Sequence, residues 1–264
     1  MTRARSVLAV VLALAAAALA AASAPARAER LVTSLSNYRV SIASNFTGAE
    51  LVLFGTVDRD AATVPRRGGY DLVVSVIGPR QTVVTWRKDR VLGIWVNAES
   101  RTFVDAPSYL AVLTNRPVDM IAGPDRQRRL QIGLTNVLLP QDIGGDVADV
   151  VRDDPFRMAF VRLRTEQGLY LERTNGVTFL TPTLFRAAIP LPADAPIGSY
   201  EVDVKLLADG ALVGRERTAF ELYKVGFEQV VANAARYHGL AYGLATAGLA
   251  LFVGWLASVV FRRD

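Results

Sequence analysis

Ser199–Leu207 reads SYEVDVKLL, and this stretch decides the fold class. The even-numbered positions from Tyr200 to Leu206 are apolar, whereas the odd-numbered positions from Glu201 to Lys205 are charged. An alternation with period two is typical of a β-strand that has one buried face and one polar face. We therefore predict that this strand lies with its even-numbered side chains on a hydrophobic core.

The residues around this strand complete a β-hairpin. Ala208-Asp209-Gly210 is a typical turn sequence, and Leu212–Tyr223 returns as the second strand. On the N-terminal side, Pro196-Ile197-Gly198 leads into Tyr200, which gives the pattern P-x-G-x-Y-x-V-x-V that is common among immunoglobulin-like sandwiches. This pattern indicates a fold and says nothing about function.

Short runs of β-branched and aromatic residues, bounded by Gly, Pro, Asp or Arg-rich breaks, occur in two parts of the chain. They cover residues 38–42, 51–57, 72–77, 82–86 and 92–96 in the first part, and residues 169–173, 176–180 and 185–189 in the second. This spacing suits an antiparallel sandwich rather than βαβ units. We expect a mainly β fold with two immunoglobulin-like sandwich lobes, residues 29–116 and 169–224, and we leave open whether the lobes share one core.

A helical segment over residues 117–168 is predicted between the lobes. Asp154 is a suitable N-cap, Pro155 suits the first helical position, and Gly168 ends the helical pattern. The segment is rich in arginine: Arg126, Arg128, Arg129, Arg152, Arg157, Arg162 and Arg164. These cations could form an anion-binding or membrane-facing surface, but the interleaved aspartates and Glu166 favour a neutralised, solvated face.

Residues 1–28 have the order of a secretory signal peptide. The apolar run Val7–Ala22 follows two arginines, and Ala26-Arg27-Ala28 offers small residues at positions −3 and −1 of a cleavage site. We predict cleavage after Ala28. The alternative is an uncleaved N-terminal anchor, although the apolar run is shorter than the ~20 residues that a spanning helix needs.

The C-terminal end has the pattern of a membrane anchor. Residues 225–239 suit an amphipathic juxtamembrane helix, and residues 240–261 contain no charged side chain, a length that can cross a hydrocarbon core about 30 Å thick. The tail, residues 262–264, begins with Arg262 and Arg263, which form a stop-transfer signal that stays cytoplasmic. We expect the chain to span a membrane once, with the intervening region on the exported side.

Small residues recur along the predicted span at intervals of three or four positions: Gly239, Gly243, Ala247, Ala250, Gly254 and Ser258. Small side chains let two helix backbones approach closely, and such packing drives helix association in lipid. The stripe predicts a homodimer or docking on a polytopic membrane protein. The alternative is that it reflects only a high content of Ala and Gly.

The composition excludes several classes of site. The 264 residues include 1 His and no Cys, which excludes disulfides, thiol nucleophiles and Cys-ligated metals and argues against multi-His sites. Residues 29–239 carry 25 basic and 24 acidic side chains, so the surplus of positive charge lies at the ends and a nucleic-acid partner is not expected. No phosphate-binding or nucleophile motif occurs with its proper context. We predict no catalytic, metal or cofactor-binding residue, no cofactor, and no enzymatic activity.

A few residues invite a functional interpretation, each with a simpler alternative. Trp86 and Trp95, on neighbouring strand candidates, could line a ligand groove, although packing in the core is the default expectation. His238 is expected to be a polar residue at the membrane interface. Asp153-Asp154 is expected to cap a helix rather than to form a catalytic carboxylate pair.

Four phrases of the sequence are distinctive: Ser44–Asp58 (SNFTGAELVLFGTVD), Tyr70–Pro79 (YDLVVSVIGP), Val91–Asn97 (VLGIWVN) and Leu184–Leu207. With them, the whole layout resembles a family of alphaproteobacterial transmembrane proteins that has no established activity, so no functional residue is carried over. The resemblance implies a bacterial inner-membrane protein with a periplasmic ectodomain and a cytoplasmic C-terminus. The resemblance also implies that the genes of such proteins often lie beside the gene of a sulfite exporter.

Three hypotheses for function follow. The leading one is a membrane-anchored periplasmic accessory or interaction subunit without catalytic activity, assisting a membrane transporter. The second is a periplasmic ligand-binding or sensing domain whose cleft uses Trp86, Trp95 or the central arginines. The third is a carboxylate-dependent hydrolase, which would need an acidic pair that converges in a cleft.

Overall fold

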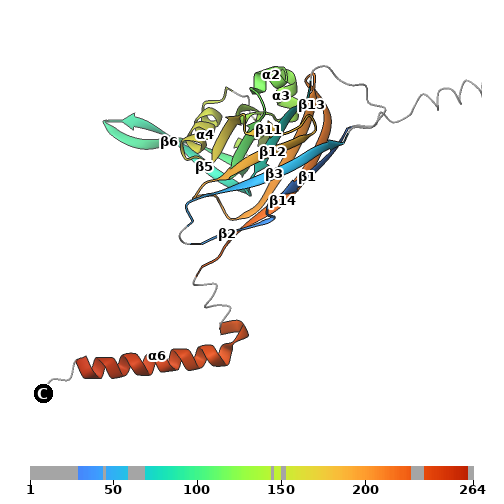
Figure 1. Cartoon of the computed structure of the whole chain (residues 1–264). Coiled ribbons are helices and arrows are strands. Elements are labelled where there is room, and N and C mark those ends of the chain that lie inside the picture. Colours follow the sequence, from blue (N-terminus) through green and yellow to red (C-terminus); the bar gives the residue numbers. More distant parts are fainter. Residues whose placement is uncertain are drawn as a thin grey trace, which may run out of the picture.

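The computed structural model describes residues 29–43, 46–58, 69–143, 146–149, 153–226 and 235–260. The predicted signal peptide with its cleavage site after Ala28, most of the predicted juxtamembrane helix over 225–239, and the tail 262–264 lie outside these residues. Within the described residues the chain is mainly β, with several sheets and one C-terminal apolar helix (Figure 1). This confirms the predicted fold class.

The larger sheet of the body has six strands and contains the predicted hairpin. Its order is β10 (Tyr170–Thr174), β7 (Leu110–Thr114), β4 (Asp71–Ile77), β13 (Gly198–Ala208), β14 (Ala211–Lys224) and β2 (Arg39–Ile42). β13 pairs antiparallel with both β14 and β4, so the strand with the clearest alternation lies inside the sheet. The pairs β10–β7 and β14–β2 are parallel, which departs from a purely antiparallel arrangement.

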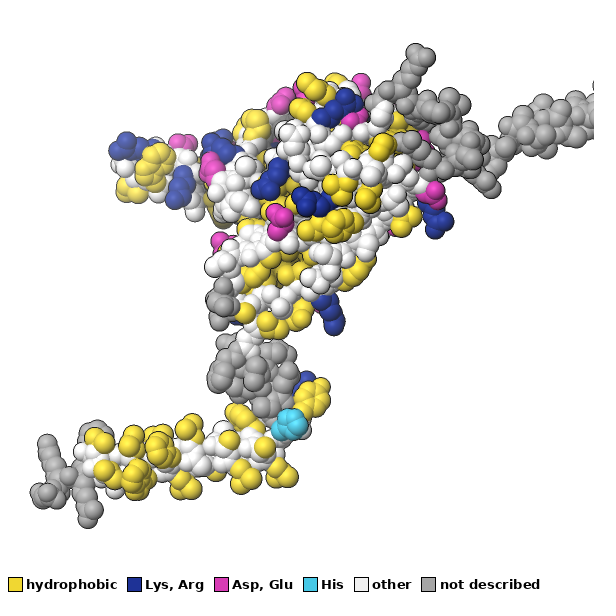
Figure 2. Space-filling model, viewed as in Figure 1, with side chains coloured by type: hydrophobic (Ala, Val, Ile, Leu, Met, Phe, Trp, Pro, Cys, Tyr) yellow, Lys and Arg dark blue, Asp and Glu magenta, His cyan; other side chains and the backbone are white. Residues whose placement is uncertain are grey.

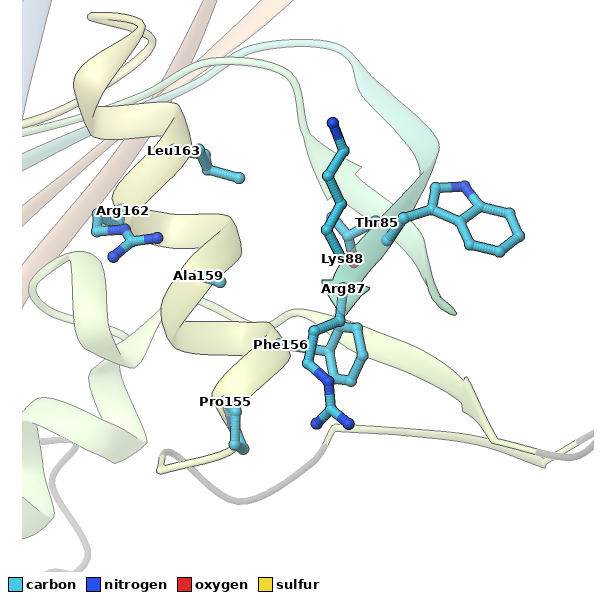
Figure 3. Close-up of a pocket in the computed structure, with 9 residues that line it drawn as sticks. Thr85, Arg87, Lys88, Pro155, Phe156, Ala159, Arg162 and Leu163 are labelled. Atoms are coloured by element: carbon cyan, nitrogen blue, oxygen red, sulfur yellow. The ribbon is translucent and has the colours of Figure 1, made fainter. Parts of the chain in front are cut away.

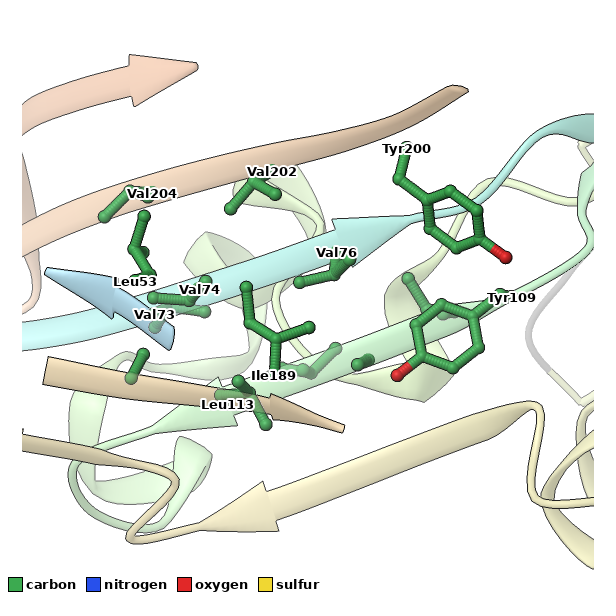
Figure 4. Packing of buried hydrophobic residues seen from close by; sticks show 14 of the residues in the cluster. Leu53, Val73, Val74, Val76, Tyr109, Leu113, Ile189, Tyr200, Val202 and Val204 are labelled. Carbon is green, nitrogen blue, oxygen red and sulfur yellow. The ribbon is translucent and has the colours of Figure 1, made fainter. Parts of the chain in front are cut away.

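A four-stranded sheet covers one face of the larger sheet. Its order is β1 (Arg30–Leu35), β3 (Ala49–Asp58), β12 (Leu184–Leu191) and β11 (Val177–Phe179). In Figure 4, Leu53 and Ile189 of this sheet lie against Val74, Val202 and Val204 of the larger sheet, and all five side chains are completely buried. The removal of this apolar surface from water, worth roughly 25 cal/mol per Å², stabilises the sandwich.

The two β parts of the sequence share this one core. β3 from the first part pairs with β12 from the second, and β4 pairs with β13, so strands of both parts lie side by side in both sheets. Buried side chains from both parts also belong to one hydrophobic cluster. The question that the sequence left open is thereby answered, and one body replaces the expected division into two lobes.

The hairpin of β13 and β14 forms as its sequence predicts. Asp209 and Gly210 have φ values of 49° and 73°, as in a tight two-residue hairpin turn. Tyr200 is completely buried, its hydroxyl donates a hydrogen bond to the carbonyl oxygen of Pro196, and its ring stacks on Phe220 with centroids 4.9 Å apart. A tyrosine that binds the backbone a few residues upstream is a feature of immunoglobulin-like sandwiches.

The middle segment, residues 117–168, contains both helices and strands. Its helical elements are α2 (Val118–Ile121), α3 (Pro124–Leu130), the 3₁₀ turn η1 (Leu134–Asn136) and α4 (Pro155–Glu166). The segment also holds β8 (Pro140–Ile143) and β9 (Asp146–Asp149), which the helical prediction missed. These strands extend a third sheet of order β5-β6-β8-β9, in which β5 (Arg80–Val91) and β6 (Ile94–Pro107) form a long hairpin.

The C-terminal helix α6 covers Gly239–Val260, within one residue of the predicted span at each end. Its most apolar window has a mean hydropathy of 1.9, and none of that window is buried against the described part of the chain. By length and composition the helix can cross a membrane.

Candidate functional site

The hairpin of β5 and β6 projects from the body, and its distal half is exposed. Every residue from Trp86 to Glu99 is exposed. At the tip, Leu92 is 97% exposed and Ile94 is 69% exposed. In Figure 2, hydrophobic and basic side chains gather on this projection. Large apolar side chains that gather in water are typical of an interaction surface.

Trp86 and Trp95 do not pack in the core, contrary to the default expectation. Both lie in the exposed half of the hairpin, with exposed fractions of 56% and 66%. The expectation was wrong because aromatic and β-branched residues mark a strand without showing what covers it.

Strand pairing assigns the side chains of the hairpin to two faces. Arg101 lies on the face toward α4, because its guanidinium is 5.1 Å from the centroid of the Phe156 ring. Thr85 pairs with Arg101 and therefore shares this face. Since side chains alternate along a strand, Trp86 lies on the opposite, outer face.

Apolar side chains occupy both faces at the tip. Val91 pairs with Ile94, and the next pair is Arg90 with Trp95. Because neighbouring positions on a strand point to opposite faces, Ile94 and Trp95 lie on opposite sides of the ribbon. Leu92 lies in the turn between the strands, so apolar surface surrounds the tip.

A groove of about 250 Å³ lies between β5 and α4 (Figure 3). Phe156, Ala159 and Leu163 form its apolar wall on α4, and residues 85–88 form the side given by the hairpin. The basic side chains that line it are Arg87, Lys88 and Arg162. The groove therefore combines an apolar wall with a basic edge, which suits an amphipathic or acidic partner.

The position of α4 is fixed by its cap and by aromatic packing. Asp154 accepts a hydrogen bond from the backbone N–H of Phe156 at 3.3 Å, which confirms the predicted cap. The Phe160 ring stacks on Phe103 of β6 with centroids 4.5 Å apart and meets Tyr170 of β10 edge-on at 5.9 Å. These contacts attach the wall of the groove to two sheets.

Arg157 on α4 is buried, which departs from the predicted solvated face. Its guanidinium lies 2.7 Å from the Asp149 carboxylate and donates hydrogen bonds to the carbonyl oxygens of Thr135 and Val137. A buried guanidinium with these acceptors is satisfied. Arg157 therefore fixes α4 to the body rather than offering its charge to a ligand.

The other central arginines lie on the surface of α3 and α4, except Arg152, which is outside the described residues. Arg128 pairs with Asp125, and Arg162 lies 3.8 Å from Glu166, as a neutralised face requires. The structure records no ion pair with a described acid for the remaining three: Arg126, Arg129 and Arg164. The six arginines that the structure describes are thus spread over several environments and do not form one cluster.

A group of charges lies in the six-stranded sheet, where Asp203 and Lys205 are buried and Arg215 is exposed, and none of its members lines the groove. The Lys205 Nζ lies 2.6 Å from the Asp203 carboxylate, and Arg215 donates to both Asp203 oxygens at 2.7 and 2.8 Å. Burial raises the pKa of the Asp203 carboxyl, but the hydrogen bonds and charges of Arg215 and Lys205 outweigh burial and hold this pKa below its usual value.

The Lys205 ammonium responds in the opposite way to the same burial. Burial lowers its pKa, and the neighbouring Asp203 carboxylate offsets only part of that effect. Because the three charged groups satisfy one another, we interpret them as a structural ion network rather than a reactive centre.

No group of three or more His, Cys, Asp or Glu side chains that could hold a metal ion occurs in the described ranges. His238 is exposed and directly precedes α6, where its carbonyl oxygen accepts from the Tyr242 N–H at 2.9 Å. Asp153 lines a second hollow on the other side of α4, together with Arg157 and Met158.

The six predicted helix-packing residues all lie on α6 and are exposed: Gly239, Gly243, Ala247, Ala250, Gly254 and Ser258. A Cβ atom added at Gly239, Gly243 or Gly254 would meet no atom within 4 Å. The stripe is therefore open for a second helix, and its association stays a prediction.

Sequence analysis missed the tip of the β5–β6 hairpin. Residues 92–96 were expected to form one strand, whereas Leu92 and Gly93 form the turn, with φ values of 50° and 86°. The signal that could have revealed it is Gly93 inside an uncharged run that directly follows the charged stretch Arg87–Arg90.

Residues 30–263 match the model of a protein family described as "Putative transmembrane protein (Alph_Pro_TM)". The match begins at the first residue of β1 and includes both sheets of the sandwich, the projecting hairpin and α6. Comparison with curated proteins and with solved structures gives no match.

Proposed function

The chain belongs to the Alph_Pro_TM family of transmembrane proteins, and from this premise we propose that it is a noncatalytic, membrane-anchored interaction subunit. In this proposal α6 is the anchor, and the groove between β5 and α4 receives a partner protein. The observation that carries the proposal is the open groove with its apolar wall of Phe156, Ala159 and Leu163. Apolar surface that stays in water is a common sign of a protein contact.

The proposed location follows from the two ends of the sequence. Residues 1–28 have the pattern of an export signal, and Arg262 and Arg263 follow the span directly. The body would lie in the bacterial periplasm, α6 would cross the inner membrane once, and the C-terminus would remain in the cytoplasm. The leading partner is a polytopic membrane protein, a transporter in the first instance, and the second is another copy of this chain.

The small-residue stripe of α6 gives this partner a second contact. At about 100° per residue, its six positions fall within an arc of roughly 100° around the helix. Gly248 lies outside this arc, although it is also a glycine of α6. Close approach of a partner helix along the arc would bring backbones into contact, which is the main source of association in lipid.

The proposal is tested by crosslinking and affinity purification of the full chain from native membranes. One variant fills the stripe with Gly243→Leu, Ala247→Leu and Gly254→Leu, and Gly248→Leu is its control. A second variant blocks the groove with Ala159→Arg. Its control is Met158→Arg, because Met158 is the adjacent residue and lines the hollow on the other side of α4.

We expect one polytopic protein to be enriched with the unmodified chain and with both controls. It should be lost or strongly reduced with the stripe variant and with the groove variant. Recovery of the same partner from all four variants would contradict the proposal, as would the absence of any enriched protein. Recovery of only the chain itself would instead indicate a homodimer.

A small amphipathic ligand in the same groove is the second candidate function, because the groove joins an apolar wall to a few basic groups, although its volume of about 250 Å³ is just below the usual range of ligand pockets. The chain has 3 Trp, so Trp95→Phe with Trp255→Phe leaves Trp86, which lies on the strand that borders the groove with its side chain on the outer face, as the single reporter. We expect ligand binding to shift the emission of Trp86. A flat response across panels of anions and metabolites would count against this alternative.

A further inference from the structure

Leu92 is an unfavourable residue for the turn that it occupies. With φ values of 50° at Leu92 and 86° at Gly93, both central residues of this two-residue turn are left-handed. Such turns favour Asn-Gly, because an L side chain other than Asn or Asp pays a steric penalty there. Leu92 is also 97% exposed, so it is unfavourable in water as well. A residue that violates both rules points to a function of the tip.

The apolar part of the tip has the depth of a membrane interface. Residues 91–96 carry no charge, and Ile94, Trp95 and Val96 extend for about 10 Å at ~3.3 Å per residue. Segments that lie in the lipid headgroup region bury their apolar side chains to a depth of about 5–10 Å. The uncharged end of the hairpin therefore fits this layer.

The charged and aromatic residues stand where an interfacial segment needs them. Arg90 directly precedes the uncharged tip, and Lys88 lies two positions before Arg90, with Asp89 between them. No ion pair with a described acid is recorded for Lys88 or Arg90, whereas Arg87 lies 3.2 Å from Glu99. Although the Arg90 Nε donates to the Gly93 carbonyl oxygen at 3.4 Å, exposed cations beside an apolar tip can bind anionic headgroups. Trp95 is one of the residues that prefer the boundary between water and lipid.

The shape of the tip favours lipid over protein as its surroundings. Ile94 and Trp95 lie on opposite faces of the ribbon, and Leu92 lies at its end, so apolar side chains point in three directions. A flat protein surface would cover one of these faces, whereas lipid headgroups surround an inserted tip on all sides.

The chain also keeps the hairpin near a membrane. Residues 225–238 connect β14 to α6, and 14 residues reach at most about 50 Å. This length allows the body to turn its hairpin toward the bilayer. A tether of this kind raises the local concentration of lipid at the tip.

We propose that the tip of the β5–β6 hairpin, residues 91–96, inserts into the headgroup region of the bilayer that holds α6. The hairpin is then a second, reversible membrane contact that orients the body, and the groove beside α4, with it. This inference does not depend on the identity of any protein partner.

The test uses a single spin label on the full chain, because the sequence contains no Cys. Leu92→Cys places the label at the tip, and Leu180→Cys, at a 53% exposed leucine in the turn after β11, is the control. Both proteins are placed in nanodiscs of phosphatidylcholine alone and of phosphatidylcholine with one quarter phosphatidylglycerol. The measurement is the accessibility of the label to oxygen, which concentrates in lipid, and to a water-soluble nickel complex.

We expect the ratio of oxygen to nickel accessibility to be several-fold higher at position 92 than at position 180. Shielding in both lipid mixtures supports insertion by apolar side chains, and shielding only with phosphatidylglycerol supports insertion aided by Lys88 and Arg90. Equal ratios at the two positions in both mixtures would overturn the proposal. Shielding in native membranes that is absent from both nanodiscs would also overturn it and would indicate a protein contact.

A second variant separates insertion from effects of the label. Ile94→Asp in the Leu92→Cys protein adds a charge to the tip and should abolish the shielding of the label. Because the Ile94 side chain does not pack against the described part of the body, this variant should keep the thermal unfolding midpoint of the labelled parent. Full shielding in a folded Ile94→Asp protein would contradict apolar insertion.

Discussion

The sandwich core and the β5–β6 hairpin contain the same kinds of apolar residue, but these residues are buried in the core and exposed in the hairpin. Ile189 in β12 is completely buried between the two sheets, whereas Ile94 at the start of β6 is 69% exposed. Both side chains belong to strands with antiparallel neighbours. The difference between the regions is therefore not in local structure but in whether a second sheet covers the strand. It predicts that substitutions in the body change stability and that substitutions at the tip change membrane contact.

The largest effect is expected from Asp203→Asn in the body. The substitution leaves the buried Lys205 ammonium without its carboxylate, and the loss of one partner of a buried ion pair costs about 3–5 kcal/mol. Urea unfolding of the full chain measures this loss in the free energy of unfolding. Lys205→Met is the matched control, because it removes the buried cation while Arg215 still pairs with Asp203, and it should change stability little.

The same network sets a dependence on pH. The pKa of Asp203 is lower in the folded chain than its usual value near 4, so its contribution to stability is fully present above pH ~4 and is lost as the pH falls through the lowered pKa. The Asp203→Asn protein should lack this part of the acid dependence. An unchanged acid limb in that variant would contradict the role given to the network.

The next effect compares one residue type in the two regions directly. Ile189→Ala removes buried methyl and methylene groups from the core and should lower the free energy of unfolding by about 2–5 kcal/mol. Ile94→Ala removes the same groups from an exposed tip and should change it by less than about 0.5 kcal/mol. Equal losses in the two variants would show that the tip packs against the body.

A smaller loss is expected where two strands of the four-stranded sheet approach closely. Gly55 of β3 pairs with Phe185 of β12, and a methyl group at Gly55 would overlap the completely buried Phe185 ring. Gly55→Ala should therefore cost about 1–3 kcal/mol, the usual range for overpacking. Gly93→Ala is not a suitable control because of its positive φ, whereas Gly123→Ala meets no neighbouring atom and is suitable.

The smallest effect on stability is expected at Leu92, with the opposite sign. Leu92→Asn places a residue that tolerates the left-handed conformation at φ 50°, so it should raise the free energy of unfolding by at most about 1 kcal/mol. The same variant should weaken binding of the full chain's hairpin to lipid, measured as loss of quenching of Trp95 by brominated lipids in a protein whose other two Trp residues are Phe. A gain in stability without a loss of quenching would show that Leu92 affects the turn but not the membrane contact.

Local patterns in the sequence predicted most of the strands of the body. The alternation of β13 and the buried run of β4 both appear where expected, because a strand with a covered face must place apolar side chains on it. The short strands β8 and β9 were not predicted, since they carry acidic and small residues that also suit helices and loops. Pairing between distant strands, such as β3 with β12, has no local signature.

The candidate site was harder to predict from the sequence than the fold. Trp86 and Trp95 were identified as candidates for a groove, but the apolar content of their strands favoured the core. Only the absence of a covering layer distinguishes the two outcomes, and that absence is a property of the whole fold. The groove itself depends on the packing of Phe160 against Phe103, which brings α4 beside a hairpin some 60 residues earlier in the chain.

The attachment of the body to its anchor has a mechanical consequence. β14 ends at Lys224, 14 residues before α6, and it lies between β13 and β2, with the backbone N–H of Val225 donating to the Ile42 carbonyl oxygen at 2.7 Å. A pull from the membrane thus acts along the axis of β14 and loads the hydrogen bonds to both neighbours in shear, all at once, instead of opening them one after another like a zipper. The joint between body and anchor is therefore built to resist force, and in force spectroscopy it should yield at a higher load than the projecting hairpin pulled from its tip.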